Sequence, residues 1–413
     1  MKIVHICLCD PYAENWSYHR NILSEQNAGD GHKTYIITTE YTMDINGKPG
    51  TKEQTEYINQ FGVNVIRLKD KYKLPVSINS KINTVKGIKE KLNVIQPDII
   101  MVHNQQTFNM FDIVDYKKKN PRVILLADSH ASFANSCRNF FSRWVVQGMI
   151  FRMIIRYAFK YMDGMYYIGE EELNFFREVY GIRQTRNCIL PLPARFISET
   201  EKEKNRIEVR TDLKMSDEEL LFVHSGKLSV EKRTADILLA LKKFRNYKFK
   251  LLIIGSIPDD QIELKNLIEK DSRFIYLGWK TSGELMRYIS AADLYIMPGS
   301  VSVTMNNSLA VGTPVMLYPH KGYHRYFSGW EILVSNKNEM IRQFRSIFAN
   351  PFELREKNKK AFEAAYRYFD CKNFAQEMYC YVEKNEKALD REYINGIRYV
   401  SSESSLCKET NQV

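Results

Sequence analysis

The chain has 413 residues, which is more than one hydrophobic core usually serves, so two domains are expected. A formal net charge of +11 favours anionic partners such as sugar nucleotides, pyrophosphate lipids or an acidic membrane surface. Nucleic acid is disfavoured as a partner because no zinc-finger spacing, RNA-recognition aromatic motif or basic zipper occurs.

The seven cysteines are odd in number and form no Cys-x-x-Cys pair, which argues against a disulfide framework and a zinc site. The apolar run at the N-terminus meets Asp10 too early for a signal peptide. No apolar run approaches the roughly 20 residues of a membrane-spanning helix. We therefore expect a cytoplasmic protein, soluble or peripheral on the inner face of the plasma membrane.

Short apolar runs alternate with longer, partly helical segments through the first half of the chain. This alternation predicts an α/β domain with a parallel sheet covered on both faces. Ligands of such sheets gather beyond the carboxyl ends of the strands. The runs expected to be strands are 2–9, 33–38, 63–68, 98–103, 122–127 and 164–168.

Polar side chains follow three of these strands. Asp10 comes after the first, His103 after the fourth, and Asp128 with His130 after the fifth. A lone histidine is more often structural than functional. Several polar strand ends that meet in one crevice nevertheless favour a binding or catalytic site.

Residues 136–162 combine four arginines and a lysine with many large apolar side chains. One interpretation is an amphipathic surface that rests on anionic lipid, with its cations at the headgroups. The other is a core-facing helix with a solvated basic stripe. The sequence leaves both open.

The second half begins with a charged segment, 199–219, that is expected to be an interdomain linker. A second α/β pattern follows, and after it a charged helical region ends near residue 390. The polar residues beyond that point are expected to form a loose tail. Strands are predicted at 220–224, 249–254, 274–277, 294–297 and 315–318.

Residues 291–318 suggest strand, turn, helix, turn and strand. Pro298 ends the first strand and leaves an open turn before the helix, which Ser302 or Thr304 could cap. Backbone N–H groups in such a turn stabilise an anionic ligand. The alternative is an ordinary crossover, as in any α/β protein.

Neither G-x-x-x-x-G-K-[ST] nor G-x-G-x-x-G occurs, which argues against an ATPase and an NAD enzyme. Instead, Gly226 turns the chain after a predicted strand, and Lys227 and Lys232 flank a short loop. Two ammonium groups at a strand end can neutralise a diphosphate, although surface lysines alone would mean nothing. Gly255, after the next strand, would let a nucleotide approach closely.

The second half resembles the donor-binding part of glycosyltransferase family 4. The similar segments are, in the family's order, SGKLSVEKR, KLLIIGS, FIYLGWKTSGELMRYISAADLYIMPGS and SLAVGTPVM. Weaker similarity extends into the first half through PDIIMVHN and LLADSHASFANS. The resemblance implies a retaining enzyme of the GT-B fold, with two Rossmann-like domains that face each other across a cleft.

On this resemblance, residues 1–198 form an acceptor domain and 199–370 a nucleotide-sugar donor domain. Residues 371–390 form a helix that crosses back to the first domain, and 391–413 form the polar tail. The implied reaction is metal-independent and needs no cofactor. A nucleoside-diphosphate sugar gives up its hexose to a glycan or lipid-linked acceptor, as in lipopolysaccharide or capsule synthesis.

Site residues are carried over from the family by position. Lys227 and Lys232 would hold the donor diphosphate, and His130 would be the catalytic contact, with Asp128 beside it. The expected donor-binding set is Gly226, Lys227, Lys232, Gly255, Gly299, Ser300, Val301, Ser302, Thr304 and Asn307. The expected acceptor-binding set is Asp10, Tyr12, Trp16 and His103.

The sequence departs from the family in two places. Gly299 and Asn307 replace two frequent glutamates, although Asn307 can still hydrogen-bond a ribose. The resulting PG-x-V turn is similar to that of enzymes from bacterial surface-polysaccharide clusters. The first loop lacks the family's glycine pair, so acceptor recognition is expected to differ, with Tyr12, Trp16 and Tyr18 as candidate stacking faces.

The missing glutamates motivate a second hypothesis, a noncatalytic GT-B-like subunit that serves as a partner or membrane scaffold. A nucleotide-sugar epimerase is a third. The donor base, the sugar, the acceptor and the linkage depend on pocket shape, which a few side chains set.

Overall fold

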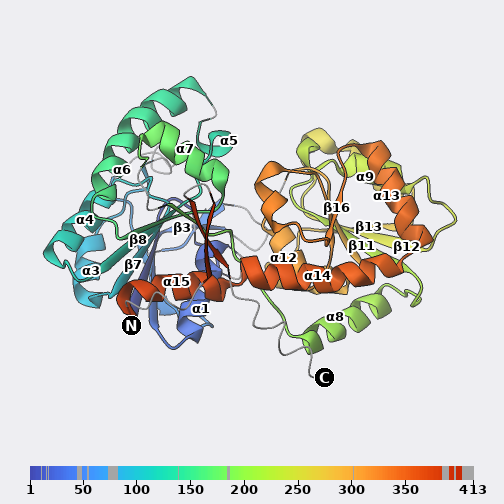
Figure 1. The fold of residues 1–413 in the computed structure, drawn as a ribbon, viewed down its shortest axis with the longest axis horizontal. Coiled ribbons are helices and arrows are strands. Elements are labelled where there is room, and N and C mark those ends of the chain that lie inside the picture. Colours follow the sequence, from blue (N-terminus) through green and yellow to red (C-terminus); the bar gives the residue numbers. More distant parts are fainter. Residues whose placement is uncertain are drawn as a thin grey trace. The chain divides into compact units, whose positions relative to one another are not determined.

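The computed structural model consists of two compact units, residues 1–193 with 371–413 (unit 1) and residues 194–370 (unit 2) (Figure 1). Val301 and the tail residues 402–413 lie outside the described part of the chain. The structure describes residues 1–10, 12–14, 16, 18–43, 49–53, 55–72, 82–137, 139–183, 187–300, 302–383, 390–394 and 397–401.

Unit 1 is built on a sheet with the strand order β17-β18-β10-β9-β8-β7-β1-β2-β6-β5. Its inner strands are parallel, and their Ile-, Val- and Leu-rich sequences suit burial on both faces. The strands are β1 (Lys2–Cys7), β2 (Lys33–Thr39), β5 (Glu56–Ile58), β6 (Asn64–Leu68), β7 (Ile99–His103), β8 (Ile124–Ser129), β9 (Gly164–Tyr167), β10 (Asn187–Ile189), β17 (Asp390–Ile394) and β18 (Ile397–Ser401). A separate hairpin pairs β3 (Tyr41–Met43) with β4 (Pro49–Thr51).

Two layers of helices cover this sheet (Figure 1). One layer comprises α3 (Ile88–Ile95), α4 (Met110–Lys119), α6 (Arg152–Phe159) and α7 (Glu170–Tyr180). The other comprises α1 (His19–Gly29) and α15 (Cys371–Glu383), whose apolar side chains share one core with the strands. The C-terminal helix is therefore part of the first unit's core.

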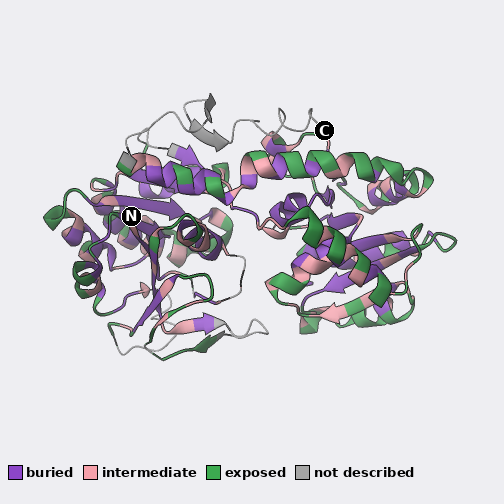
Figure 2. Cartoon of the chain, turned by 90° about the horizontal axis from the view of Figure 1, so that it is seen from below, coloured by how far each residue is buried: buried purple, intermediate pink, exposed green. Residues whose placement is uncertain are grey.

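Unit 2 has a six-stranded parallel sheet in the order β13-β12-β11-β14-β15-β16. The strand order reverses between β11 and β14, which is where α/β sheets bind ligands. The strands are β11 (Leu220–Ser225), β12 (Phe249–Ile254), β13 (Phe274–Gly278), β14 (Leu294–Met297), β15 (Val315–Leu317) and β16 (Glu331–Leu333). Figure 2 shows the strands of both sheets largely buried, while the helices keep an exposed side.

The helices of unit 2 also form two layers. One core contains side chains of α8 (Glu199–Asp212), α11 (Ser282–Ala291), α12 (Thr304–Ala310) and α14 (Phe352–Phe369). The other contains side chains of α9 (Thr234–Leu241), α10 (Glu263–Glu269) and α13 (Lys337–Ala349).

Two segments differ from the sequence-based expectation. Residues 199–212 form a helix of unit 2, not a linker, because Ser198 caps its N-terminus and Val209 packs into the core. In the segment expected to be a loose tail, 390–394 and 397–401 form a hairpin whose second strand pairs with β10.

Helix α5 (Phe133–Ser136) ends at the first residue of the segment 136–162, and the π-helix η1 (Ser142–Phe151) and α6 follow within it. Within the described ranges, no helix combines the length and the apolar character needed to cross a bilayer.

Candidate active site

The carboxyl ends of β7 and β8 bring polar side chains together in unit 1. His103 and Asp128 are partners across the two strands, and His130 follows Asp128 by two residues. His5 of β1 is paired with Met101, two residues before His103, so both histidines project from the same face of the sheet.

The Asp128 carboxylate is the centre of this cluster. His103 Nδ1 lies 2.6 Å from its Oδ2, and the backbone N–H of Asn104 donates to Oδ1 at 3.0 Å. His130 Nε2 lies 3.3 Å from Oδ1, and His19 Nδ1 lies 3.4 Å from Oδ2. The side chain of Asp128 is buried, whereas that of His130 is 24% exposed. His130 is thus the member of the pair that a substrate can reach.

The pKa values of the four ionisable groups in this cluster are shifted in different directions. Burial would raise the pKa of Asp128, but His103 and His130 outweigh it and hold that pKa well below its usual range. Burial would lower the pKa of His130, yet the charge of Asp128 and its hydrogen bond raise it. Burial lowers the pKa of His19 well below its usual value. Burial and the nearby His103 lower the pKa of His5 to about 3. His130 can therefore hold and release a proton beside a stable carboxylate.

Among the described residues, His19, Asp128 and His130 have ligand atoms within 4.8 Å of one another, close enough for a metal ion. A ligating histidine must be neutral and turn a bare nitrogen toward the metal. His130 Nε2 instead faces the Asp128 carboxylate, and the pKa of His130 is raised. This arrangement suits a proton better than a metal ion, and we assign no metal to it.

Lys232 is the central side chain of the candidate donor site in unit 2. It ends the short helix η2 (Val230–Lys232) that follows β11. Its side chain is buried, and Nζ donates to the carbonyl oxygen of Ser300, 2.8 Å away in the turn after β14. Burial lowers the pKa of Lys232, and no carboxylate in the described ranges offsets that effect. A buried ammonium group without a counter-ion is stabilised by an anionic ligand.

At two of the predicted donor-site glycines, backbone atoms of other segments leave no room for a side chain, which the sequence did not reveal. A Cβ at Gly255 would lie 1.8 Å from the carbonyl oxygen of Gly226, and Gly255 has a φ of +137°. A Cβ at Gly299 would lie 1.9 Å from the carbonyl oxygen of Glu231. The space beside both glycines is therefore filled by the chain's own backbone. This packing accounts for glycine at position 255, and the contact of Gly255 with a nucleotide stays a prediction.

The turn 299–304 also differs from expectation. Helix α12 begins at Thr304 without a side-chain cap, so neither Ser302 nor Thr304 has the predicted capping role. Asn307 is buried, and its Oδ1 accepts a hydrogen bond from the backbone N–H of Arg195 at 2.9 Å. The protein thus takes one of the two acceptor sites of this oxygen, and the amide NH₂ of Asn307 can donate to a ligand.

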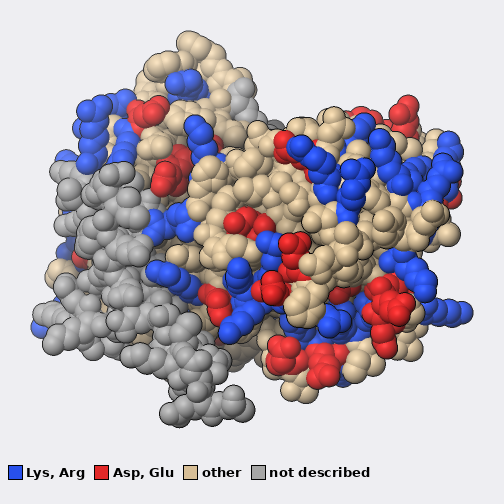
Figure 3. Space-filling model, turned by 45° about the vertical axis from the view of Figure 1, so that its right-hand side comes forward, with Lys and Arg blue, Asp and Glu red and all other residues tan. Residues whose placement is uncertain are grey.

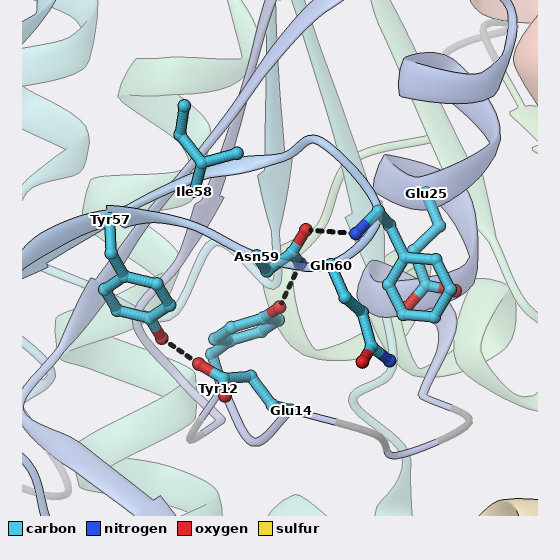
Figure 4. Close-up of a pocket in the computed structure, with 8 residues that line it drawn as sticks. Tyr12, Glu14, Glu25, Tyr57, Ile58, Asn59 and Gln60 are labelled. Atoms are coloured by element: carbon cyan, nitrogen blue, oxygen red, sulfur yellow. Dashed lines mark hydrogen bonds between the residues drawn. The ribbon is translucent and has the colours of Figure 1, made fainter.

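Tyr12 does not offer the stacking face predicted for an acceptor sugar. Its ring is buried below the Arg67 guanidinium, 5.6 Å from the ring centroid, and its hydroxyl accepts from Asn59 Nδ2 at 3.1 Å. That hydroxyl borders a pocket of about 240 Å³ in which Tyr57 donates to Glu14 (Figure 4). The pocket is lined by Tyr12, Glu14, Glu25, Tyr57, Ile58, Asn59, Gln60 and Phe61.

His103 also departs from its predicted acceptor role, because it is buried and both its ring nitrogens face protein partners. Trp16 stacks on Tyr18 with 5.2 Å between centroids, and the Arg20 guanidinium covers Tyr18. Asp10 is exposed and lies 3.8 Å from Arg20. Trp16 and Asp10 remain candidate acceptor contacts.

Sequence reasoning missed His5 and His19. His5 is a polar residue within a buried apolar strand, and His19 opens the first helix. The sequence marked them only by their residue type, since each is a histidine within a segment expected to be an apolar strand or a helix. Pairing of β1 with β7, which brings His5 beside His103, is a tertiary event.

Residues 205–367 match the family model described as glycosyl transferases group 1. No curated protein sequence matches the chain. Among solved structures, sucrose-phosphate synthase from Thermosynechococcus elongatus has a TM-score of 0.66 and 16% identity, covering 93% of this chain and 98% of that one.

The Anabaena protein HepE in complex with UDP-glucose has a TM-score of 0.63 and 12% identity, covering 93% of this chain and 100% of that one. WaaG, a glycosyltransferase involved in lipopolysaccharide biosynthesis, has a TM-score of 0.54 and 14% identity, covering 92% and 98%. These likenesses establish the GT-B fold with two Rossmann-like domains. With the match of residues 205–367, they support glycosyl transfer as the class of reaction.

Proposed function

We propose that this chain is a retaining, metal-independent glycosyltransferase of family 4. It moves a hexose from a nucleoside-diphosphate sugar to a glycan or lipid-linked acceptor, as in surface-polysaccharide synthesis, and releases the nucleoside diphosphate. The observation that carries the proposal is the buried Lys232 ammonium, which has no counter-ion in the described ranges and lies in the segment matched by the family model. A donor diphosphate supplies the missing negative charge.

In the proposed reaction, the bond from the sugar's anomeric carbon to the diphosphate breaks. The acceptor hydroxyl forms the new bond on the same face, and its proton passes to a phosphate oxygen. Lys232, with the exposed Lys227 nearby in sequence, stabilises the charge on the departing diphosphate. His130 contacts the transferred sugar in this scheme, and Asp128 orients it.

We further propose that unit 1 rests on anionic membrane, where a lipid-linked acceptor would be found. Phe140, Phe141 and Trp144 are 77%, 64% and 57% exposed beside the basic side chains of η1 and α6. A surface hollow of about 520 Å³ lies further along η1 and α6, lined by Gly148, Met149, Arg152, Met153, Arg156, Tyr157 and Lys160. Apolar side chains beside cations suit a headgroup layer.

On the face drawn in Figure 3, lysines and arginines are interspersed with acidic side chains. The net charge of +11 is therefore not displayed there as one basic surface. The described part of that face therefore does not offer a nucleic acid a continuous basic surface.

One observation favours the second candidate, a noncatalytic partner or scaffold subunit. Asn307 replaces a family glutamate, and its amide oxygen is already engaged by the Arg195 backbone. If that position serves packing alone, the donor site has lost its usual contact with the ribose.

Thermal unfolding against UDP-, GDP-, CMP- and dTDP-sugars separates these functions. A ligand at 100 times its Kd that binds only the folded state adds about 2.7 kcal/mol of stability. The enzyme proposal expects a shift with one nucleotide class, followed by transfer to an added acceptor that His130→Ala lowers by roughly 100-fold. Folded protein with no shift favours the scaffold, and donor conversion without an acceptor indicates an epimerase.

A further inference from the structure

A continuous row of hydrogen bonds runs through the interior of unit 1 from an exposed carboxylate to the Asp128 cluster. Tyr379 Oη donates to Asp30 Oδ2 at 2.8 Å, and Asn27 Nδ2 donates to Tyr379 Oη at 2.7 Å. Asn27 Oδ1 then lies 2.9 Å from His5 Nε2, and His5 Nδ1 lies 3.0 Å from His103 Nε2. Asn27, His5 and His103 are buried, and Tyr379 comes from the C-terminal helix α15.

The carboxylate at the outer end fixes the direction of every donor in this row. The Asp30 carboxylate only accepts, so the single proton of the Tyr379 hydroxyl points to it. The hydroxyl oxygen must then accept from the Asn27 amide NH₂, which turns the amide oxygen toward His5. An amide oxygen accepts only, so His5 carries its proton on Nε2.

The same reasoning continues through the two histidines. Burial and His103 lower the pKa of His5 to about 3, so His5 is neutral and its Nδ1 is a bare acceptor. His103 Nε2 must therefore donate to His5. At its other nitrogen, His103 faces the Asp128 carboxylate, which also accepts from the Asn104 backbone.

We propose that Asp30, Tyr379, Asn27 and His5 form a directional relay that holds His103 as a doubly protonated imidazolium against Asp128. His103 touches no substrate in this scheme and is a positioning residue. The positive charge of His103 offsets part of the negative charge of Asp128, so His130 experiences a weaker negative charge. The relay thereby limits how far Asp128 raises the affinity of His130 for a proton.

Glu172 of α7 interacts with His130, and burial raises the pKa of that carboxyl to about 7. Other polar groups also surround the cluster. The groups that face it from β1 and its loop, α1, β7 and the end of β8 are His5, Cys7, Cys9, Asp10, His19, Arg20, Asn104 and His130. Asp10 raises and Arg20 lowers the pKa of His130, so their effects oppose each other. Cys7 and Cys9 stay protonated because burial raises the pKa of both thiols.

The role given to His130 rests on the proposed function, but the protonation of His103 is measured without turnover. In protein with ¹⁵N-labelled histidine rings, ¹H–¹⁵N spectra separate protonated from bare ring nitrogens. His103→Gln and His5→Gln identify the signals of these two residues. We expect two protonated nitrogens on His103 at pH 7 and one on His5. A bare nitrogen on His103 at pH 7 would overturn the relay, whatever the donor screen shows.

Asp30→Asn tests the direction of the relay from its exposed end. The new amide can donate to Tyr379, which lets the whole row reverse and leaves His103 Nε2 bare. The pKa of His130 should then rise by roughly one pH unit because Asp128 is less compensated. Asp115→Asn is the matched control, since Asp115 is a carboxylate of unit 1 that pairs with Lys89. Identical His103 signals in the two variants would refute the inference, and Tyr379→Phe should reproduce the Asp30→Asn result.

Discussion

Replacing Lys232 with methionine should weaken donor binding without weakening the fold. Methionine keeps most of the aliphatic side chain that packs beside Gly226, but it removes the ammonium group. A hydrogen bond to a charged group contributes about 1.5–3 kcal/mol, so the Kd for the donor should rise about 10- to 150-fold. Because the ammonium group is buried without a counter-ion, its loss should raise the free energy of unfolding by about 1 kcal/mol.

Calorimetric titration with the nucleoside diphosphate found in the thermal screen measures the first effect, and urea unfolding measures the second. Lys227→Met is the matched comparison, because Lys227 is exposed. Its effect on Kd should stay below about fivefold. An unchanged Kd in Lys232→Met would show that the buried cation does not serve the donor. Parallel losses of affinity and stability would show that Lys232 is a structural residue.

Three further outcomes are expected. Gly255→Ala should cost more than about 3 kcal/mol in urea unfolding, because the added Cβ meets the Gly226 backbone at positive φ, whereas Gly283→Ala, in open space on a helix, should be neutral or stabilising. Asp128→Asn should lower the pKa of His130 and cost about 3–5 kcal/mol near pH 5. That cost should shrink below about pH 4, because Asp128 takes up a proton in the unfolded chain before it does so in the folded protein. It should also shrink above about pH 6.5, because the raised pKa of His130 stabilises the fold only while His130 is protonated, and equal costs from pH 4 to 8 would contradict the pairing. Trp144→Ser should reduce sedimentation with anionic vesicles and leave the melting temperature unchanged, because the ring is exposed.

The sheets could be predicted because buried parallel strands are continuous apolar runs. Each run named from the sequence, such as 249–254 or 294–297, is a strand in the structure. Strands β10 (NCI) and β16 (EIL) were missed because each begins with a polar residue and is too short for a periodic signal, whereas the equally short β15 (VML) is wholly apolar. Helix α8 was taken for a linker because its buried surface is small and most of its side chains are charged.

The candidate site shows the same limit at the level of single residues. Asp128 and His130 could be named because they are close in sequence and follow a recognisable strand. The need for glycine at position 299 could not be predicted from the sequence. The atom that leaves no room for a Cβ there is the carbonyl oxygen of Glu231, in a different segment. Likewise, the burial of Tyr12, which lies in the loop after β1, depends on Arg67 of strand β6. Contacts between segments distant in the chain decide which polar residues remain available to a ligand.

Unit 1 is discontinuous in sequence, and this has a consequence for how the protein is made. Residues 194–370 are continuous, so the whole of unit 2 leaves the ribosome before α15 does. Until then the core beneath Ile22 and Leu23 lacks Phe374 and Met378, and Asn27 lacks its Tyr379 partner. The first domain to be started during translation is thus the last to be finished, and its half-built core has to be kept from aggregating while the second domain is synthesised.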